Sequence, residues 1–174
     1  MKLIDKVISG GQTGVDQAAL VAAKRCGIPT GGTAPLGFMT EEGPRRSVLL
    51  GFGLVECGSS GYPARTLCNI KDADATLLIT PMMMGRGSRL TYSLCIQERK
   101  PVRVFYCENL FMRVTSMQPD VRDLIDWLIL RQNKLFHPLI LNVAGTREST
   151  RIGVTDECEA FLRDLFRHIR RTWG

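Results

Sequence analysis

Short apolar segments alternate with segments of helical periodicity along the whole chain, and this alternation constrains the fold more than any other feature. The segments with the character of buried strands are residues 5–11, 28–35, 54–60, 75–80, 102–107 and 138–143. Strands that alternate with helices form a mainly parallel sheet with helices packed on both faces. We therefore expect a single α/β domain over residues 1–174, a Rossmann-like three-layer sandwich with a mainly parallel sheet and helices on both faces.

Small and polar residues mark the expected ends of the helices. Gly27 follows the first periodic segment and is expected to end that helix. Ser88 and Thr155 stand before later periodic segments, and we expect each to cap a helix at its N-terminus. We interpret residues 109–118, between a strand and the next helix, as a mobile insertion.

Composition argues against several classes of protein. Residues 1–6 lack the apolar run of a secretory signal, and no stretch approaches the roughly 18 apolar residues of a membrane helix. We therefore expect a cytoplasmic protein with no membrane partner. The six cysteines form no CxxC pair, which favours structural thiols over a zinc site or a disulfide framework. The net charge is +6, but the arginines of the last segment suit a helix C-terminus, so we expect no nucleic-acid partner.

A glycine-rich motif lies where the first strand should meet the first helix. It contains Ser9, Gly10, Gly11, Gln12, Thr13, Gly14 and Asp16. Glycines let a backbone turn sharply and approach a ligand closely, and free N–H groups at a helix N-terminus favour an anion. The motif is neither a P-loop nor GxGxxG. We favour a phosphate site here, with hydrogen bonds from the serine, glutamine and threonine, over a tight turn in which Asp16 is only a first-turn carboxylate.

A second motif follows the strand of residues 75–80. Its candidate ligand contacts are Arg86, Gly87, Ser88 and Thr91. An arginine, here Arg86 or Arg89, can bind phosphate through two parallel hydrogen bonds. The alternative is a solvated helix cap with two exposed arginines. Because the carboxyl ends of parallel strands share one edge, we expect both motifs to meet at the same crevice.

Three smaller groups are expected at the same edge, each with ordinary capping or surface bonding as an equal alternative. Gly32 lies in residues 31–35, which together with Glu41, Glu42 and Gly43 form a candidate polar lid. Tyr62, Arg65, Thr66 and Asn69 recur at helical spacing and so share one helix face. Residues 142–149 follow a strand and offer Arg147 and Ser149.

Catalytic and metal-binding patterns find little support in the chain. The two histidines, His137 and His168, neighbour no serine or cysteine in a recognised arrangement. No cluster with metal-ligand spacing is visible. We therefore assign neither a catalytic nor a metal-ligating residue.

Self-association is expected from apolar residues in two loops. These are Met82, Met83 and Met84, and Leu110, Phe111 and Met112. A small polar surface rarely exposes so many large apolar side chains together. We expect a homo-oligomer.

Four stretches carry a family resemblance: residues 8–20, 27–44, 65–77 and 142–149. With these, the sequence resembles the molybdenum carrier protein family, a circularly permuted branch of the SLOG superfamily of Rossmann-like nucleotide-binding domains. The resemblance implies a homo-oligomer that carries the molybdenum cofactor (molybdopterin) or binds a related phosphorylated, nucleotide-like ligand. A nucleotide phosphoribohydrolase of the LOG type and a nucleotide-sensing module remain the alternatives.

The second motif departs from that family's pattern. Members usually have Gly-Gly-Thr-x-x-Thr after the central strand, whereas Arg86 adds bulk and charge here, which either narrows the site or pairs with a second phosphate. The superfamily hydrolases have a glutamate where this chain has Thr91. A hydroxyl cannot replace that carboxylate at neutral pH, which favours binding over hydrolysis. Glu41, Glu42 and Glu148 remain as substitutes from other loops.

Overall fold

The structure is a computed structural model that describes residues 2–59, 61–110 and 119–173. Its elements in chain order are β1 (Ile4–Ile8), α1 (Val15–Arg25), β2 (Thr30–Ala34), η1 (Leu36–Phe38), β3 (Met39–Thr40), β4 (Gly43–Pro44), α2 (Arg46–Gly51), β5 (Leu54–Glu56), α3 (Tyr62–Asp72), β6 (Ala75–Thr80), α4 (Arg86–Gln97), β7 (Val102–Tyr106), η2 (Cys107–Asn109), α5 (Pro119–Gln132), β8 (Leu139–Gly145) and α6 (Val154–Trp173). The two η elements are short 3₁₀ helices.

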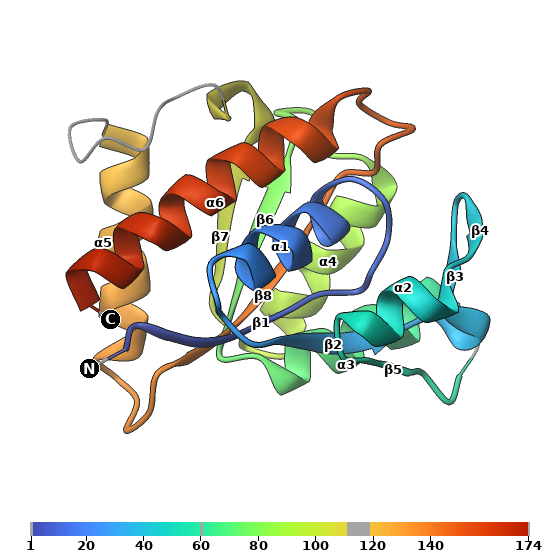
Figure 1. The fold of residues 1–174 in the computed structure, drawn as a ribbon, viewed down its shortest axis with the longest axis horizontal. Coiled ribbons are helices and arrows are strands. Elements are labelled where there is room, and N and C mark those ends of the chain that lie inside the picture. Colours follow the sequence, from blue (N-terminus) through green and yellow to red (C-terminus); the bar gives the residue numbers. More distant parts are fainter. Residues whose placement is uncertain (1, 60, 111–118, 174) are drawn as a thin grey trace.

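Six of the strands form one sheet in the order β5-β2-β1-β8-β6-β7 (Figure 1). All of its strand pairs are parallel, which confirms the expected Rossmann-like α/β fold. Although β8 is the last strand in sequence, it lies between β1 and β6. The loops after these three strands therefore emerge side by side at one edge, where open α/β sheets bind ligands.

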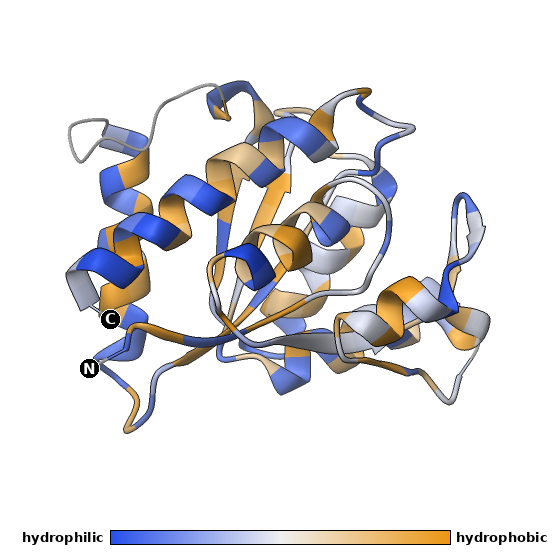
Figure 2. Cartoon of the chain, viewed as in Figure 1, coloured by the Kyte–Doolittle hydropathy of each residue, from blue (hydrophilic) through white to orange (hydrophobic). Residues whose placement is uncertain are grey.

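The two faces of the central strands carry different side chains. Leu77 of β6 and Leu141 of β8 belong to the main apolar core, together with residues of α1, α5 and α6. Thr76 and Asn142 occupy the alternate positions, on the face packed by α3 and α4. Figure 2 shows hydrophilic and hydrophobic residues alternating along α6, as expected for a helix with one buried face. The sheet thus has an apolar face and a face with buried polar groups.

The ends of the helices agree only in part with the sequence. Gly27 has φ of 65° just after α1, so the glycine stop is confirmed. Ser88 and Thr155 are not N-caps, because α4 already begins at Arg86 and α6 at Val154. In α6 the carboxylate of Glu148 instead accepts the N–H of Thr155, at 2.9 Å, and its hydroxyl.

A hairpin and a short helix between β2 and β5 were missing from the sequence interpretation. The strands β3 and β4 pair antiparallel, and α2 packs Leu49 into a small second core with Leu54 and Phe38. The hairpin reaches back to the first glycine-rich loop, where the N–H of Glu41 donates to Gln12 Oε1 at 2.9 Å. With only six residues, α2 is too short for a recognisable periodicity.

The apolar residues that suggested self-association divide into two groups. Met82 and Met83 are exposed, but Leu110 is buried, which corrects its assignment to an exposed patch. Phe111, Met112 and most of the expected mobile insertion lie outside the described residues. The homo-oligomer stays a prediction. Within the described residues, no helix has the length and apolarity needed to cross a membrane.

The close approach of β8 to its neighbours yields a stability prediction. A Cβ on Gly145 would overlap the carbonyl oxygen of Ile79, which is backbone and cannot swing away. We expect Gly145→Ala to lower the free energy of unfolding by about 2 kcal/mol or more. Gly51→Ala is the matched control, because a Cβ there meets nothing within 4 Å. Its stability in denaturant titration should stay within about 1 kcal/mol of the parent, and equal losses in both variants would contradict the packing argument.

Candidate functional site

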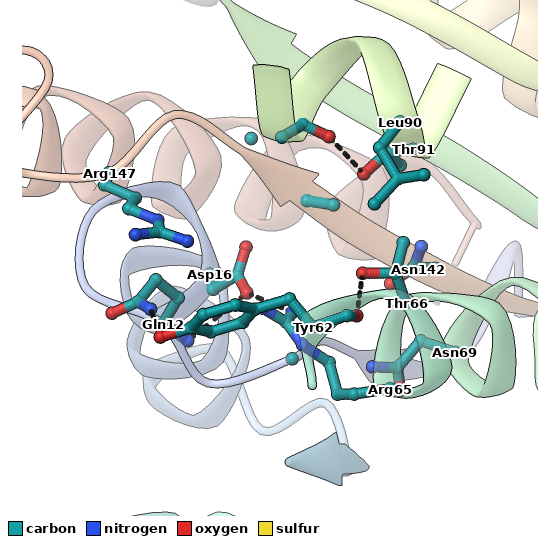
Figure 3. Close-up of a pocket in the computed structure, with 14 residues that line it drawn as sticks. Gln12, Asp16, Tyr62, Arg65, Thr66, Asn69, Leu90, Thr91, Asn142 and Arg147 are labelled. Atoms are coloured by element: carbon teal, nitrogen blue, oxygen red, sulfur yellow. Dashed lines mark hydrogen bonds and ion pairs between the residues drawn. The ribbon is translucent and has the colours of Figure 1, made fainter. Parts of the chain in front are cut away.

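Two adjoining hollows lie where β1, β6 and β8 end. The inner cleft lies between α3 and α4, over β8 (Figure 3), and its lining residues are Gly10, Gln12, Asp16, Tyr62, Arg65, Thr66, Asn69, Gly87, Leu90, Thr91, Asn142, Ala144, Gly145 and Arg147. The outer basin is lined by Gly85, Arg86, Gly87, Ser88, Gly145, Thr146, Arg147, Ser149 and Thr150. The hollows share Gly87, Gly145 and Arg147, so a single ligand can extend from one into the other.

A buried ion pair forms one wall of the cleft. Arg65 of α3 donates through Nη1 to Asp16 Oδ2 of α1 at 3.0 Å, and both side chains are at least nine-tenths buried. The guanidinium fills the space beside Gly10, where any Cβ would collide with it. Gly10 therefore admits an arginine of the protein itself, rather than the ligand expected from the sequence.

Acceptors of the protein itself already stand at the N-terminus of α1. The N–H of Val15 donates to Thr146 O at 3.1 Å, and the carboxyl group of Asp16 accepts the N–H of Gln12 at 3.3 Å. Burial raises the pKa of Asp16 and outweighs the charge of Arg65. Because an acceptor of the chain already stands at this helix end, a phosphate gains little there. The tight-turn alternative describes this helix end better than a phosphate site.

The polar side chains of the first motif also have partners inside the protein. Ser9 Oγ donates to Val143 O at 2.6 Å, and Thr13 Oγ1 donates to Glu41. Gln12 Oε1 accepts the N–H of Thr13 at 3.0 Å, and Nε2 donates to the hydroxyl of Tyr62 at 3.4 Å. Of these three residues only Gln12 lines the cleft.

Three glycines of the prediction pack against protein atoms rather than the hollows. A Cβ on Gly11 would press on Leu49 and Leu54 of the small core, and one on Gly14 would meet the backbone of residues 146–148. Gly32 lines a separate groove beside Lys6, and a Cβ on it would overlap the backbone of Ser9. All three have positive φ, which glycine adopts at least cost. Their role here is close packing.

The N-terminus of α4, by contrast, is open. No N–H of Arg86, Gly87 or Ser88 donates to another described residue, and the cap, Gly85, offers no side chain. Ser88 is only 5% exposed, yet its hydroxyl has no hydrogen-bond partner among the described residues and it lines the basin. Free N–H groups at a helix N-terminus, beside the unpaired hydroxyl of a serine that is itself almost fully buried, form a candidate anion site.

Two arginines flank this helix end. The guanidinium of Arg147 lies 4.7 Å from the ring centre of Tyr62, and both residues line the cleft (Figure 3). Arg86 is exposed on the first turn of α4 and lines the basin. Arg89 lines neither hollow. The sequence left Arg86 and Arg89 as equivalent candidates, and of these two only Arg86 lines a hollow.

The glutamates named as substitutes for a catalytic carboxylate are engaged elsewhere. Glu41 accepts hydrogen bonds from Thr13 and from the N–H and hydroxyl of Ser149. Partial burial alone would raise the pKa of Glu41, but those hydrogen bonds lower it. Glu42 pairs with Arg45 on the surface, and Glu148 stands at the start of α6. Glu41 therefore fastens the hairpin to two loops of the site.

Two residues that line the cleft carry buried polar atoms without a partner among the described residues. Asn142 is 2% exposed and donates through Nδ2 to Thr76 Oγ1 at 3.2 Å, while its Oδ1 has no partner among the described residues. Arg65 Nε is likewise buried and unpaired. Leaving such an atom unsatisfied costs about 1–3 kcal/mol. A ligand that supplies hydrogen bonds here would recover that cost.

The sixteen predicted ligand residues divide into eleven that line a hollow and five that do not. Those lining the cleft or the basin are Gly10, Gln12, Asp16, Arg65, Asn69, Arg86, Gly87, Ser88, Thr91, Arg147 and Ser149. Ser9, Gly11, Thr13, Gly14 and Gly32 line neither. The side chain of Asn69 is hydrogen-bonded to Thr33, because its Oδ1 accepts the N–H of Thr33 at 2.8 Å.

Six residues that line the cleft were not among the predicted ligand contacts. They are Tyr62, Thr66, Leu90, Asn142, Ala144 and Gly145. The shared helix face of Tyr62 and Thr66, and the strand alternation of Asn142 and Ala144, were usable signals. Leu90 offered none, because one apolar residue in an amphipathic helix normally belongs to the core.

Comparison with known proteins gives a consistent assignment. A family model described as the circularly permuted YpsA SLOG family matches residues 7–166. A crystal structure of a putative molybdenum carrier protein from Syntrophus aciditrophicus SB is 32% identical, with a TM-score of 0.80, and the match covers 95% of this chain and 96% of that one. No curated protein matches. The family match spans nearly the whole chain, so the protein belongs to the circularly permuted YpsA branch of the SLOG family.

Proposed function

We propose that the protein binds a phosphorylated pterin or nucleotide, with a phosphate on the first turn of α4 and the heterocycle in the inner cleft. The unpaired hydroxyl of Ser88, beside the free N–H groups of the same turn, is the observation that carries this proposal. Arg147 adds a cation between the two hollows. The unpaired atoms of Asn142 and Arg65 supply hydrogen-bonding groups for a polar ring.

The molybdenum cofactor is the ligand we propose first, as a cargo rather than a reactant. The support is the similarity to a protein described as a putative molybdenum carrier. Among the described residues that line the hollows, none is a cysteine or histidine, so the cleft offers hydrogen bonds and not soft metal ligands. We infer that such a cargo is held through its phosphate and its ring.

We infer binding without hydrolysis, because the described lining of the cleft offers no carboxylate that is free to assist bond cleavage. Asp16 is the one acidic residue among the described residues that line the cleft, and Arg65 and Gln12 already hydrogen-bond to it. Thr91 Oγ1 donates to Gly87 O at 3.1 Å. A glycosidic bond breaks with help from a carboxylate that is free to exchange a proton or stabilise charge.

The phosphate position can be tested with two serines of one helix. We expect Ser88→Ala to weaken binding of adenosine 5′-monophosphate about tenfold, since a hydrogen bond to a charged group contributes about 1.5 kcal/mol or more. Ser88→Asp should abolish binding, because its carboxylate would occupy the anion position. Ser93 of α4 is exposed and lines neither hollow, so Ser93→Ala and Ser93→Asp are the controls. Titration calorimetry that shows equal effects at both serines would exclude this site.

The absence of hydrolysis can be tested directly. Purified protein is incubated with a panel of nucleoside 5′-monophosphates, and free base is measured by chromatography. We expect no release above that of heat-denatured protein. Release at an enzymatic rate that Asp16→Asn removes would contradict the proposal and support the phosphoribohydrolase alternative.

A further inference from the structure

The outer basin carries more positive charge than one phosphate requires. Arg86 and Arg147 both line it, and the free end of α4 adds the partial positive charge of the helix dipole. None of the described residues that line the basin is acidic. Clustered like charges without a counter-charge are costly in the free protein, so this arrangement favours an anionic ligand.

Neither arginine has an ion pair within the described residues. Arg86 has no described hydrogen-bond, ion-pair or ring partner, and Arg147 contacts the ring of Tyr62. Glu41 is close enough for the charge of Arg147 to lower its pKa slightly, but its oxygens already accept bonds from Thr13 and Ser149. Both guanidinium groups therefore remain available to a ligand.

The basin adjoins the cleft, because the two hollows share lining residues. Gly87 and Gly145 belong to both hollows, and Ser88 lies on the basin side. A phosphate on the N–H groups of Gly87 and Ser88 would stand between the ring site and Arg86. A further group attached to that phosphate would extend into the basin.

We propose that the ligand is a diphosphate ester, with a second phosphate held by Arg86 in the outer basin. This inference rests on the proposed function, which places the first phosphate on α4. Arg86 acts as a specificity-determining residue, because its fork of N–H donors matches two phosphate oxygens. A pyrophosphate-linked pterin or nucleotide would place its ring in the cleft and its second phosphate in the basin. A monophosphate would leave the basin without an anion.

The experiment compares adenosine 5′-diphosphate with the 5′-monophosphate by titration calorimetry at physiological salt, where long-range attraction is screened. The parent protein should bind the diphosphate about tenfold more tightly or better. Arg86→Ala should weaken the diphosphate about tenfold and the monophosphate much less. Arg89→Ala is the matched control, an exposed arginine of the same helix outside both hollows, and should keep the diphosphate preference.

Two sets of results would overturn the inference, and they are distinguishable. Equal affinities of the parent protein for the two nucleotides, or equal losses in Arg86→Ala and Arg89→Ala, would refute the second phosphate while leaving the first. Failure of the parent protein to bind either nucleotide, or full binding by Ser88→Asp, would refute the proposed function and this inference together.

Discussion

The buried pair between Asp16 and Arg65 is the interaction on which the arrangement of the site depends. It joins the start of α1 to the first turn of α3, and so fixes one wall of the cleft. The glycine at position 10 is required for it, since the guanidinium lies where a side chain would begin. Breaking a buried pair by removing one partner typically costs 3–5 kcal/mol, because the remaining charge is left without compensation.

Hydrogen-bond partners within the protein distinguish the helix ends that could receive an anion. The helices α1 and α4 both start at the same edge of the sheet, and both would attract a phosphate through their dipoles. At α1 the N–H of Val15 donates to the carbonyl oxygen of Thr146, and the carboxyl group of Asp16 accepts the N–H of Gln12 in the loop just before the helix. In α4 the N–H groups of the first three residues have no acceptor among the described residues. The two ends therefore have different roles, one structural and one for binding.

The alternation of strands and helices was sufficient to predict the fold, since it constrains an α/β sheet strongly. The shared face of Tyr62, Arg65 and Asn69 was also readable from helical spacing. What the pattern could not supply were partners far away in sequence. Whether the N–H of Val15 at the start of α1 is free depends on Thr146, and whether the hydroxyl of Thr13 is free depends on Glu41 of an unpredicted hairpin.

Glycines illustrate the same limit. A glycine-rich turn indicates that something approaches the backbone closely, but not whether that is a ligand or the protein. Gly11 faces leucines of the small core, whereas Gly87 has open space around it. Only the three-dimensional structure separates these two cases, because the leucines come from α2 and β5.

The most direct test of this account is a crystal structure of the protein with adenosine 5′-diphosphate. We expect one phosphate within hydrogen-bonding distance of the N–H groups of Gly87 and Ser88, and the Asp16–Arg65 pair intact. Phosphates bound instead at the loop of residues 9–14, with that pair broken and the start of α4 empty, would contradict this expectation.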